Sequence, residues 1–466
     1  YGDHRDLHLS IRRQRQMCIR DSHNIHPWTN FATFKEEGSL VMAKSNGNYV
    51  YDTEGNKYLD GIAGLWCVNI GYRHHTMVKA IADQINEITY YTTFGHVVTP
   101  PAAELAAKIA ELAPGDLNHT FFGTGGSMSN DTAIRIIHFY FNRLGKPNKK
   151  KIISRVSSYH GSTYLAMTLT GEKADHIGFD LAKDLVYYVS APNCYRRPDG
   201  TTLDQFCDQL VEEFENKILE LGEDNVAAFI AEPIMGAGGV IVAPPGYHKR
   251  MKEVCEKYGM LYISDEVVTA FGRLGHFFAS EEVFNIVPDI ITSAKGISSG
   301  YVPLSATILS DKIYDVISDG PQEEGALFTH GFTYAGHPVS CAAGLANIRI
   351  MEEGLICDHV QQIGPYFKRQ LETLSDLDIV GDVRGSHFML CVENVKDKKT
   401  KELFDASVNI GKRIAVHCQS RGVIVRPIGH LNVLSPPLTL SRDEIDILVS
   451  TLRESIEATM DDLARE

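Results

Sequence analysis

The 466-residue sequence contains no apolar run close to the roughly 18 residues that a membrane-spanning helix requires. It also lacks an extended basic stripe with interleaved aromatic residues, and its formal net charge is −14, so nucleic acid is not an expected partner. An N-terminal apolar segment of about 7–15 residues, which a secretory signal needs, is missing too. We therefore expect a soluble cytoplasmic protein that engages neither a membrane nor nucleic acid.

Paired cysteines and metal-binding motifs are absent as well. The nine cysteines are scattered from Cys18 to Cys418 without a C-x-x-C pair, which favours reduced thiols over a disulfide framework. No H-E-x-x-H motif or paired-cysteine zinc spacing occurs, so we expect no metal site. The composition, 44% hydrophobic and 22% charged, is that of a globular protein long enough for more than one domain.

The first 22 residues, Tyr1–Ser22, have little apolar periodicity, and we interpret them as a non-native or disordered leader. Their arginines also fit a transit peptide, although three aspartates in the same stretch argue against it. We expect that deletion of this leader leaves activity intact.

The middle of the chain has a regular alternation of short apolar runs and helical segments. The seven runs are Thr120–Phe122, Lys151–Arg155, Leu185–Ser190, Val226–Ala231, Leu261–Ser264, Ile290–Ser293 and Ser305–Leu309. Such alternation predicts an α/β fold, in which a mostly parallel seven-stranded sheet is flanked by helices.

Both chain ends have a different pattern, which predicts a second, smaller α+β domain. Short alternating runs with turn residues between Leu40 and Asp60 predict a small antiparallel sheet. The other expected elements are helices at Met77–Ile88, Pro100–Leu112, Pro338–Glu352, Cys357–Leu374 and Arg442–Met460, and strands at Asp378–Val380, Phe388–Cys391, Val423–Val425 and Leu431–Leu434. We assign residues 87–345 to the large domain, and residues 23–86 and 346–466 to the small one.

A carboxylate and an amine follow two of the predicted strands. Asp265 comes directly after Leu261–Ser264, and Lys295 comes shortly after Ile290–Ser293. If both strands are parallel, the two side chains meet at the sheet edge where open α/β sheets bind ligands. Each residue alone is more often structural or at the surface, but a protonated pyridine nitrogen would pair with Asp265, and an imine link would remove the charge of Lys295.

Two loops at other strand ends could complete such a site. In Phe121–Thr132 a strand runs into a glycine-rich turn that opens a helix, which is either a plain capped turn or a phosphate site built from free N–H groups. Tyr159 and His160 follow another strand, where they either form a packed loop pair or stack on a planar cofactor. A carboxylate, an amine, a phosphate loop and a stacking aromatic residue are together the four contacts that pyridoxal phosphate needs.

Several motifs make this interpretation specific. They are Ala231–Gly239 (AEPIMGAGG), Ile263–Val267 (ISDEV), Phe271–Arg273 (FGR), Ser293–Gly296 (SAKG) and His330–Pro338 (HGFTYAGHP). In order and spacing they closely resemble the class III pyridoxal-phosphate aminotransferases, and within that family the amine:pyruvate (omega-) transaminases. The resemblance extends from about His26 to the C-terminus.

The resemblance implies a fold-type-I homodimer, which could assemble further, with active sites at the subunit interface. It implies that Lys295 forms the Schiff base with pyridoxal 5'-phosphate and shuttles the proton, and that Asp265 holds the pyridinium. The other implied cofactor-binding residues are Gly126 and Ser127 at the phosphate, Val267 and Tyr159 on the two ring faces, His160 in the same loop, and Thr333 from the partner subunit. Met128 departs from the acidic residue that many members have at this position, so its side-chain contact is not carried over.

The resemblance also implies a substrate site and a reaction. Its aromatic walls match Trp66, Phe94, Tyr159 and Trp28, and Arg426 matches an arginine that pairs with the carboxylate of pyruvate or alanine. The expected activity is a ping-pong transfer from a primary amine or omega-amino compound to pyruvate, giving alanine. The alternative in the same family is a 4-aminobutyrate or other omega-amino acid aminotransferase that uses 2-oxoglutarate. A pyridoxal-phosphate decarboxylase, a racemase or a non-catalytic cofactor-binding protein are the rivals from other classes.

Overall fold

The computed structural model describes residues 23–32, 34, 39–319 and 327–466, so the predicted leader Tyr1–Ser22 lies outside the described residues. The chain divides into two compact units: residues 1–45 with 50–57, and residues 46–49 with 58–466. The strands β1 (Met42–Asn46) and β2 (Tyr49–Asp52) lie mainly in the first unit. There the Asp52 carboxylate accepts hydrogen bonds from the backbone N–H groups of Glu54 and Asn56, both at 2.9 Å, which closes the turn after β2.

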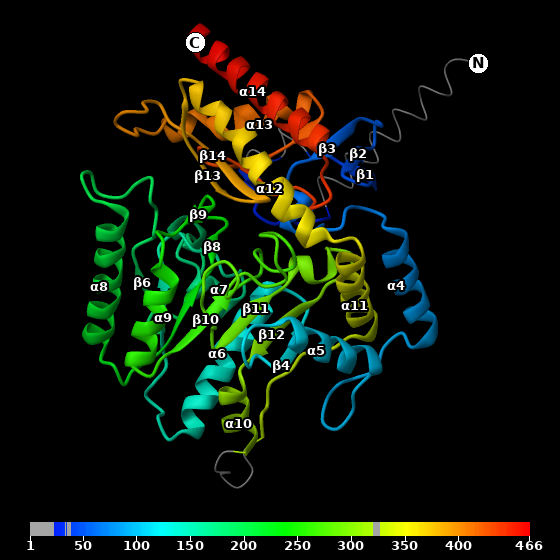
Figure 1. Cartoon of the computed structure of the whole chain (residues 1–466), viewed down its shortest axis with the longest axis vertical. Coiled ribbons are helices and arrows are strands. Elements are labelled where there is room, and N and C mark those ends of the chain that lie inside the picture. Colours follow the sequence, from blue (N-terminus) through cyan, green and yellow to red (C-terminus); the bar gives the residue numbers. More distant parts are fainter. Residues whose placement is uncertain (1–22, 33, 35–38, 320–326) are drawn as a thin grey trace. The chain divides into compact units, whose positions relative to one another are not determined.

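The second unit is built around a seven-stranded sheet with the order β4-β12-β11-β10-β7-β5-β6 (Figure 1). Its strands are β4 (His119–Gly123), β5 (Lys151–Arg155), β6 (Val186–Val189), β7 (Val226–Ala231), β10 (Leu261–Asp265), β11 (Ile290–Ser293) and β12 (Ser305–Leu309). Only β12 runs against its neighbours, β11 and β4. The prediction of a mostly parallel sheet is therefore confirmed, strand by strand to within a residue or two.

Helices cover both faces of this sheet because side chains alternate between the two faces along each strand. Ile230 and Ile263 pack with Ile137 of α6 (Gly126–Arg143) on one face. Phe229 and Tyr262, one residue earlier on the same strands, pack on the other face with α8 (Leu203–Leu221) and α9 (Tyr247–Lys257). The other elements of this region are α3 (Ala63–Trp66), α4 (His75–Glu87), α5 (Pro100–Leu112), α7 (Tyr164–Leu169), η1 (Lys173–His176), β8 (Ile234–Met235), β9 (Ile241–Val242), η2 (Lys295–Ser298), α10 (Asp311–Asp319) and α11 (Pro338–Glu353).

The C-terminal part of the second unit is an antiparallel sheet with helices, as expected for an α+β arrangement. The sheet order is β13-β14-β17-β16, formed by β13 (Val380–Ser386), β14 (Met389–Asn394), β16 (Arg426–Ile428) and β17 (Leu431–Leu434). The helical elements are α12 (Ile356–Glu372), η3 (Thr373–Asp376), η4 (Ala406–Val408), α13 (Ile410–Ser420) and α14 (Arg442–Arg465). The short strand β15 (Val423–Ile424) pairs in parallel with β3 (Lys57–Asp60), through Val423 and Leu59, so segments from both chain ends share a sheet.

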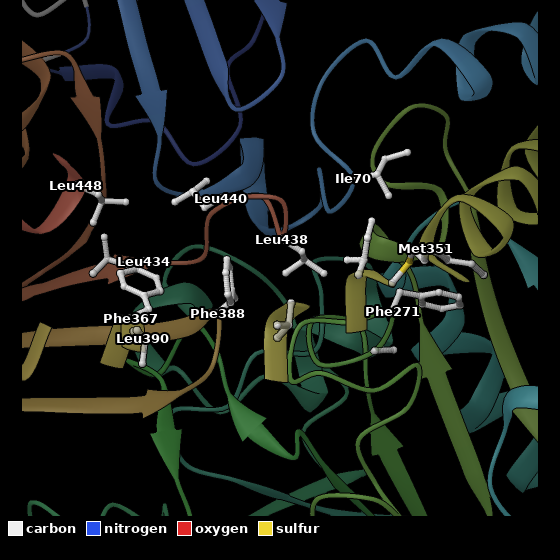
Figure 2. Close-up of a cluster of buried hydrophobic side chains, with 14 of the residues drawn as sticks. Ile70, Phe271, Met351, Phe367, Phe388, Leu390, Leu434, Leu438, Leu440 and Leu448 are labelled. Atoms are coloured by element: carbon white, nitrogen blue, oxygen red, sulfur yellow. The ribbon is translucent and has the colours of Figure 1, made fainter. Parts of the chain in front are cut away.

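A large apolar cluster joins these elements. Phe367 of α12 packs edge to face on Phe388, with ring centroids 5.8 Å apart, and Leu390 and Leu434 lie beside them (Figure 2). The same cluster includes Phe271, which lies in the loop after β10. Burial of these side chains holds the loops at the end of the large sheet against the C-terminal part of the unit.

In this region one predicted strand was wrong in its bounds, and two elements were not predicted. The strand expected at Asp378–Val380 begins only at Val380 and continues to Ser386. The helix α13 and the strand β16 were not predicted. Strand β16 has only three residues, one of them Pro427, and so gives no alternation that a pattern could detect.

Candidate active site

The ends of β10 and β11 place Asp265 and Lys295 at one edge of the sheet. The two strands are parallel, and Asp265 is the direct neighbour of Thr292 across the pair. Lys295 follows three residues after Thr292 and opens the turn η2 with a positive φ of 46°. This confirms the expectation that the two strands end together.

The Asp265 carboxylate is buried, at 4% exposure, and accepts three hydrogen bonds. Its Oδ2 atom accepts from His160 Nδ1 at 2.7 Å and from Asn130 Nδ2 at 2.9 Å, while Oδ1 accepts from the backbone N–H of Val267 at 3.1 Å. A carboxylate can only accept, so the Nδ1 atom of His160 carries the proton. These donors stabilise a buried negative charge, which in turn suits a cationic partner.

The Lys295 side chain is prepared to react as an amine. Burial lowers its pKa, and the charge of Asp265 opposes that shift. Its ammonium has no hydrogen bond or ion pair with the part of the chain that the structure describes. A lowered pKa increases the neutral fraction, which is the form that attacks a carbonyl group.

The N-terminus of α6 has the features of an anion-binding end. Its N-cap is Gly125, which has no side chain to cap the helix, so the first N–H groups of this 18-residue helix are available to a ligand. A Cβ atom added to Gly126 would lie 3.0 Å from both methyl groups of Val267, so only glycine fits there without a shift. The Ser127 hydroxyl accepts from the backbone N–H of Ser162 at 3.1 Å, which ties the loop after β5 to this helix end.

The loop after β5 is anchored by Glu232. This buried carboxylate accepts from the backbone N–H groups of Tyr159 at 3.1 Å and Gly236 at 2.8 Å. Burial raises the pKa of Glu232, and burial also raises the pKa of the Tyr159 phenol. Both hydrogen bonds of Glu232 come from backbone N–H groups, so this residue supports the loop structurally.

Arg426 lies on the Tyr159 side of the site. Burial lowers the pKa of its guanidinium, and the interaction with the Tyr159 phenol opposes this shift. The positive charge of Arg426 also contributes to the lowered pKa of Lys295. Within the described residues Arg426 makes neither an ion pair nor a side-chain hydrogen bond, which leaves a cationic fork without a partner of opposite charge.

The structure does not bring all of the aromatic residues predicted for the substrate site to the sheet edge where Asp265 and Lys295 lie. Trp66 is 5% exposed and packs with Met389 and Leu431, and its ring edge lies beside Gly236. Phe94 is 55% exposed and lies near Gly331. Trp28 belongs to the first unit, where its side chain is 63% exposed.

Thr333 lies in the exposed loop after Gly331, and among the described residues no hydrogen bond links it to the other cofactor-binding candidates. Its carbonyl oxygen accepts a hydrogen bond from the Tyr90 hydroxyl at 2.7 Å. Its predicted role, contact with the phosphate in the partner subunit, stays a prediction.

Sequence reasoning missed two residues of the site, Asn130 and Thr292. Asn130 donates to Asp265 and accepts from the Thr292 hydroxyl at 2.8 Å. Asn130 follows Gly126 by four residues, and Thr292 is the cross-strand neighbour of Asp265, so helix periodicity and sheet register were the available signals.

These features fit pyridoxal phosphate. The open helix end matches a phosphate group, the desolvated Lys295 matches an aldehyde, and the triply bonded Asp265 matches a protonated ring nitrogen. The fold and the site thus define a pyridoxal-phosphate-dependent enzyme of fold type I.

Comparisons with known proteins give the family. The model of the class III aminotransferases matches residues 32–456. The putrescine–pyruvate aminotransferase of Pseudomonas aeruginosa is 40% identical over 448 residues, which is 96% of both chains. A probable mitochondrial gamma-aminobutyrate transaminase 2 of Oryza sativa subsp. indica is 40% identical over 427 residues, 91% of this chain and 86% of that protein. The chain belongs to the class III aminotransferases.

Solved structures agree with this assignment. An (S)-enantioselective omega-transaminase from Thermomicrobium roseum has a TM-score of 0.92 and 40% identity, with 96% of this chain and 99% of that one covered. The omega-transaminase of Pseudomonas jessenii in complex with PMP has a TM-score of 0.92 and 38% identity, with 95% and 97% covered. The protein is therefore a pyridoxal-phosphate-dependent transaminase that takes amine and keto-acid substrates.

A search of the described helices for a membrane span finds none with the required length and apolar character.

Proposed function

We propose that the protein transfers an amino group from a primary amine or omega-amino compound to pyruvate, giving alanine. The observation that carries this proposal is Arg426, a largely buried guanidinium without a carboxylate partner in the described chain, close to Tyr159 and Lys295. A guanidinium fork binds a carboxylate such as that of a 2-keto acid. The relative from Pseudomonas aeruginosa, a putrescine–pyruvate aminotransferase, supports this acceptor.

We assign the following roles to the residues of the site. Bound pyridoxal phosphate supplies an electron-withdrawing ring that makes a C–H bond of the amine acidic. The Lys295 amine takes this proton and returns it, because it is buried close to the Asp265 charge and has no competing partner in the described chain. Asp265 stays anionic at the ring nitrogen, held by its three donors.

The remaining roles concern binding. The N–H groups of Gly126 and Ser127 bind the phosphate at the start of α6, and Val267 and Tyr159 lie on the two ring faces, with His160 behind Asp265. Trp66, buried beside the Glu232–Gly236 turn, lines the amine pocket. The roles of Phe94 and Trp28 stay predictions.

The first experiment is a half-reaction. The cofactor-loaded protein is mixed with a primary amine in the absence of an acceptor, and the cofactor absorbance and the released carbonyl compound are measured. We expect the absorbance to shift and one equivalent of carbonyl product to appear per active site, as a ping-pong mechanism requires. Lys295→Ala should abolish the reaction, whereas Lys217→Ala, which removes a partly exposed lysine of α8 that pairs with Glu220, should not. An unchanged absorbance over a panel of amines would refute the transaminase proposal.

The second experiment separates the two acceptors. Gamma-aminobutyrate transaminases are as similar in sequence as the putrescine enzyme, so use of 2-oxoglutarate is the second candidate. With one donor fixed, kcat/KM is compared for pyruvate and 2-oxoglutarate. Arg426 can bind one carboxylate, so we expect pyruvate to be preferred. A preference for 2-oxoglutarate would instead require a second cation for its distal carboxylate.

The assembly and location are also part of the proposal. The exposed aromatic and apolar residues around Phe94 and Thr333 support a homodimer interface next to the site; they are Tyr91, Val98, Leu327 and Tyr334. Light scattering on the purified protein tests this, because a monomer would exclude it. The eight cysteines of the described chain are free, which supports the reducing cytoplasm.

A further inference from the structure

The Asn130 side chain is buried at 1% exposure and uses all of its polar atoms within the site. Its Nδ2 group donates to Asp265 Oδ2 at 2.9 Å and to the His160 carbonyl oxygen at 2.7 Å. Its Oδ1 atom accepts from the Thr292 hydroxyl at 2.8 Å. A buried amide with every bond made is fixed in one orientation.

Thr292 holds the other end of this amide. It neighbours Asp265 in the register of β10 and β11, and its hydroxyl donates to the amide oxygen. With the amide reversed, its oxygen would face the Asp265 carboxylate and the His160 carbonyl oxygen, which can both only accept. These two acceptors therefore set the orientation of the amide, and the Thr292 hydroxyl holds the amide oxygen in that orientation.

Helix α6 connects this amide to the anion-binding end. Asn130 lies four residues after Gly126, hence on the same face of the helix one turn further on. One rigid turn of helix thus separates the N–H groups proposed for the phosphate from the amide that holds Asp265. The helix sets the distance between the two ends at which the cofactor is held.

We propose that Asn130, held in place by Thr292, is a positioning residue that fixes the Asp265 carboxylate for the cofactor ring nitrogen. This rests on the proposed role of Asp265. The other charged or titratable groups around Asp265 are His160 of the loop after β5, Tyr159 beside it, Glu232 after β7 and Lys295 after β11, with Arg426 beyond. In the part of the chain that the structure describes, no residue after β7 or β11 hydrogen-bonds the Asp265 carboxylate, so Asn130 and His160 are its side-chain supports.

The sheet provides a matched control. Thr307 of β12 is the direct neighbour of Thr292 across the next strand pair, and it is equally buried. Its hydroxyl donates to the Ser129 carbonyl oxygen at 3.0 Å, also on α6 but without a link to Asp265. Thr292→Val and Thr307→Val remove the same hydroxyl group from adjacent positions. Only Thr292→Val should affect the hydrogen bonds that position Asp265.

The test compares Thr292→Val, Asn130→Asp and Thr307→Val with the wild type and with Asp265→Asn. The apoproteins are titrated with pyridoxal phosphate to obtain dissociation constants, and the pH at which the bound cofactor changes its visible absorbance is measured. Thermal unfolding of the apoproteins reports on folding. We expect Asn130→Asp to weaken cofactor binding by about tenfold or more, because two carboxylates in contact do not both stay ionised. Thr292→Val should weaken it by about three- to tenfold and shift the absorbance transition, with Thr307→Val within about twofold of the wild type.

Each outcome decides the matter. Equal losses in Thr292→Val and Thr307→Val would mean that general packing of α6 is responsible, and the proposal would be wrong. If Asp265→Asn alone weakens binding, the role of Asp265 stands and the role of Asn130 is refuted. If Asp265→Asn has no effect either, the proposed function of Asp265 itself fails. Should Asn130→Asp not fold, Thr292→Val against Thr307→Val still gives the answer.

Discussion

Replacement of Arg426 by methionine should slow the half-reaction with pyruvate and leave the half-reaction with the amine donor largely unchanged. Methionine keeps an unbranched stem that packs like that of arginine but removes the guanidinium. In the described chain this group has no carboxylate partner, so its loss breaks no ion pair within the protein. What is lost is the set of charge-assisted hydrogen bonds to the keto-acid carboxylate, about 1.5–3 kcal/mol, which lowers kcat/KM for pyruvate by about 10- to 150-fold.

The assay measures the two halves separately. Single-turnover reaction with benzylamine, without acceptor, should change by less than about threefold, because an uncharged tail does not need a guanidinium. Arg421→Met, the same change at a residue paired with Glu454 on the surface, serves as the control for charge loss. The thermal midpoint of the apoprotein should not fall, because a buried cation without a partner is removed. Equal losses in both half-reactions, or an unchanged kcat/KM for pyruvate, would refute the assignment of Arg426.

Three further variants test the buried polar groups and the helix end. Burial lowers the pKa of His248 to about 3, so its contribution to stability is complete above its ordinary pKa of about 6.5 and is lost as the pH falls toward 3. Urea unfolding between pH 7 and 5 should show a slope of up to about 1.4 kcal/mol per pH unit that His248→Gln removes, and an unchanged slope would contradict this. Glu266→Gln should lower the unfolding free energy by about 2–4 kcal/mol, measured in urea, because its carboxylate accepts four hydrogen bonds, from Thr269, Ala279 and twice from Ser280. Gly126→Ala, whose new methyl group would lie 3.0 Å from Val267, should weaken cofactor binding several-fold in an apoprotein titration by overpacking, and full affinity would show that Val267 moves freely.

The meeting of Asp265 and Lys295 at one sheet edge could be predicted from the sequence because the ends of strands are local signals. Asp265 and Lys295 each follow an apolar run, and the rule that parallel strands share a carboxyl edge brings them together without knowledge of side-chain positions. The contact of Asn130 with Asp265 is of another kind. Helix periodicity and sheet register bring Asn130 and Thr292 toward the site, but the contact itself also depends on how far α6 is displaced along the sheet.

The surroundings of the residues proposed to bind the substrate were harder to predict from the sequence, for physical reasons. Arg426 lies on the three-residue strand β16, which has no pattern of its own and is held by pairing with β17. Trp66 adopts a positive φ of 64°, an unusual backbone state for a bulky residue, so the direction of its ring could not be inferred from the sequence. Thr333 and Phe94 lie in exposed loops, so their contacts depend on the molecule that packs against these loops.

This contrast has a consequence for how the site can change. Asp265 accepts hydrogen bonds from three donors, which lie in the loop after β5, on α6 and in the backbone two residues after Asp265 itself. A substitution at one of these positions therefore disturbs the others. Arg426 and Trp66 lie on a short strand and a buried turn, and within the described chain neither hydrogen-bonds Asp265 or Lys295. Substitutions at Arg426 and Trp66 should therefore alter the choice of amine and keto acid while cofactor affinity stays constant. Such a separation would let the choice of substrate vary within the class III aminotransferases, whose members include both a putrescine–pyruvate aminotransferase and a gamma-aminobutyrate transaminase.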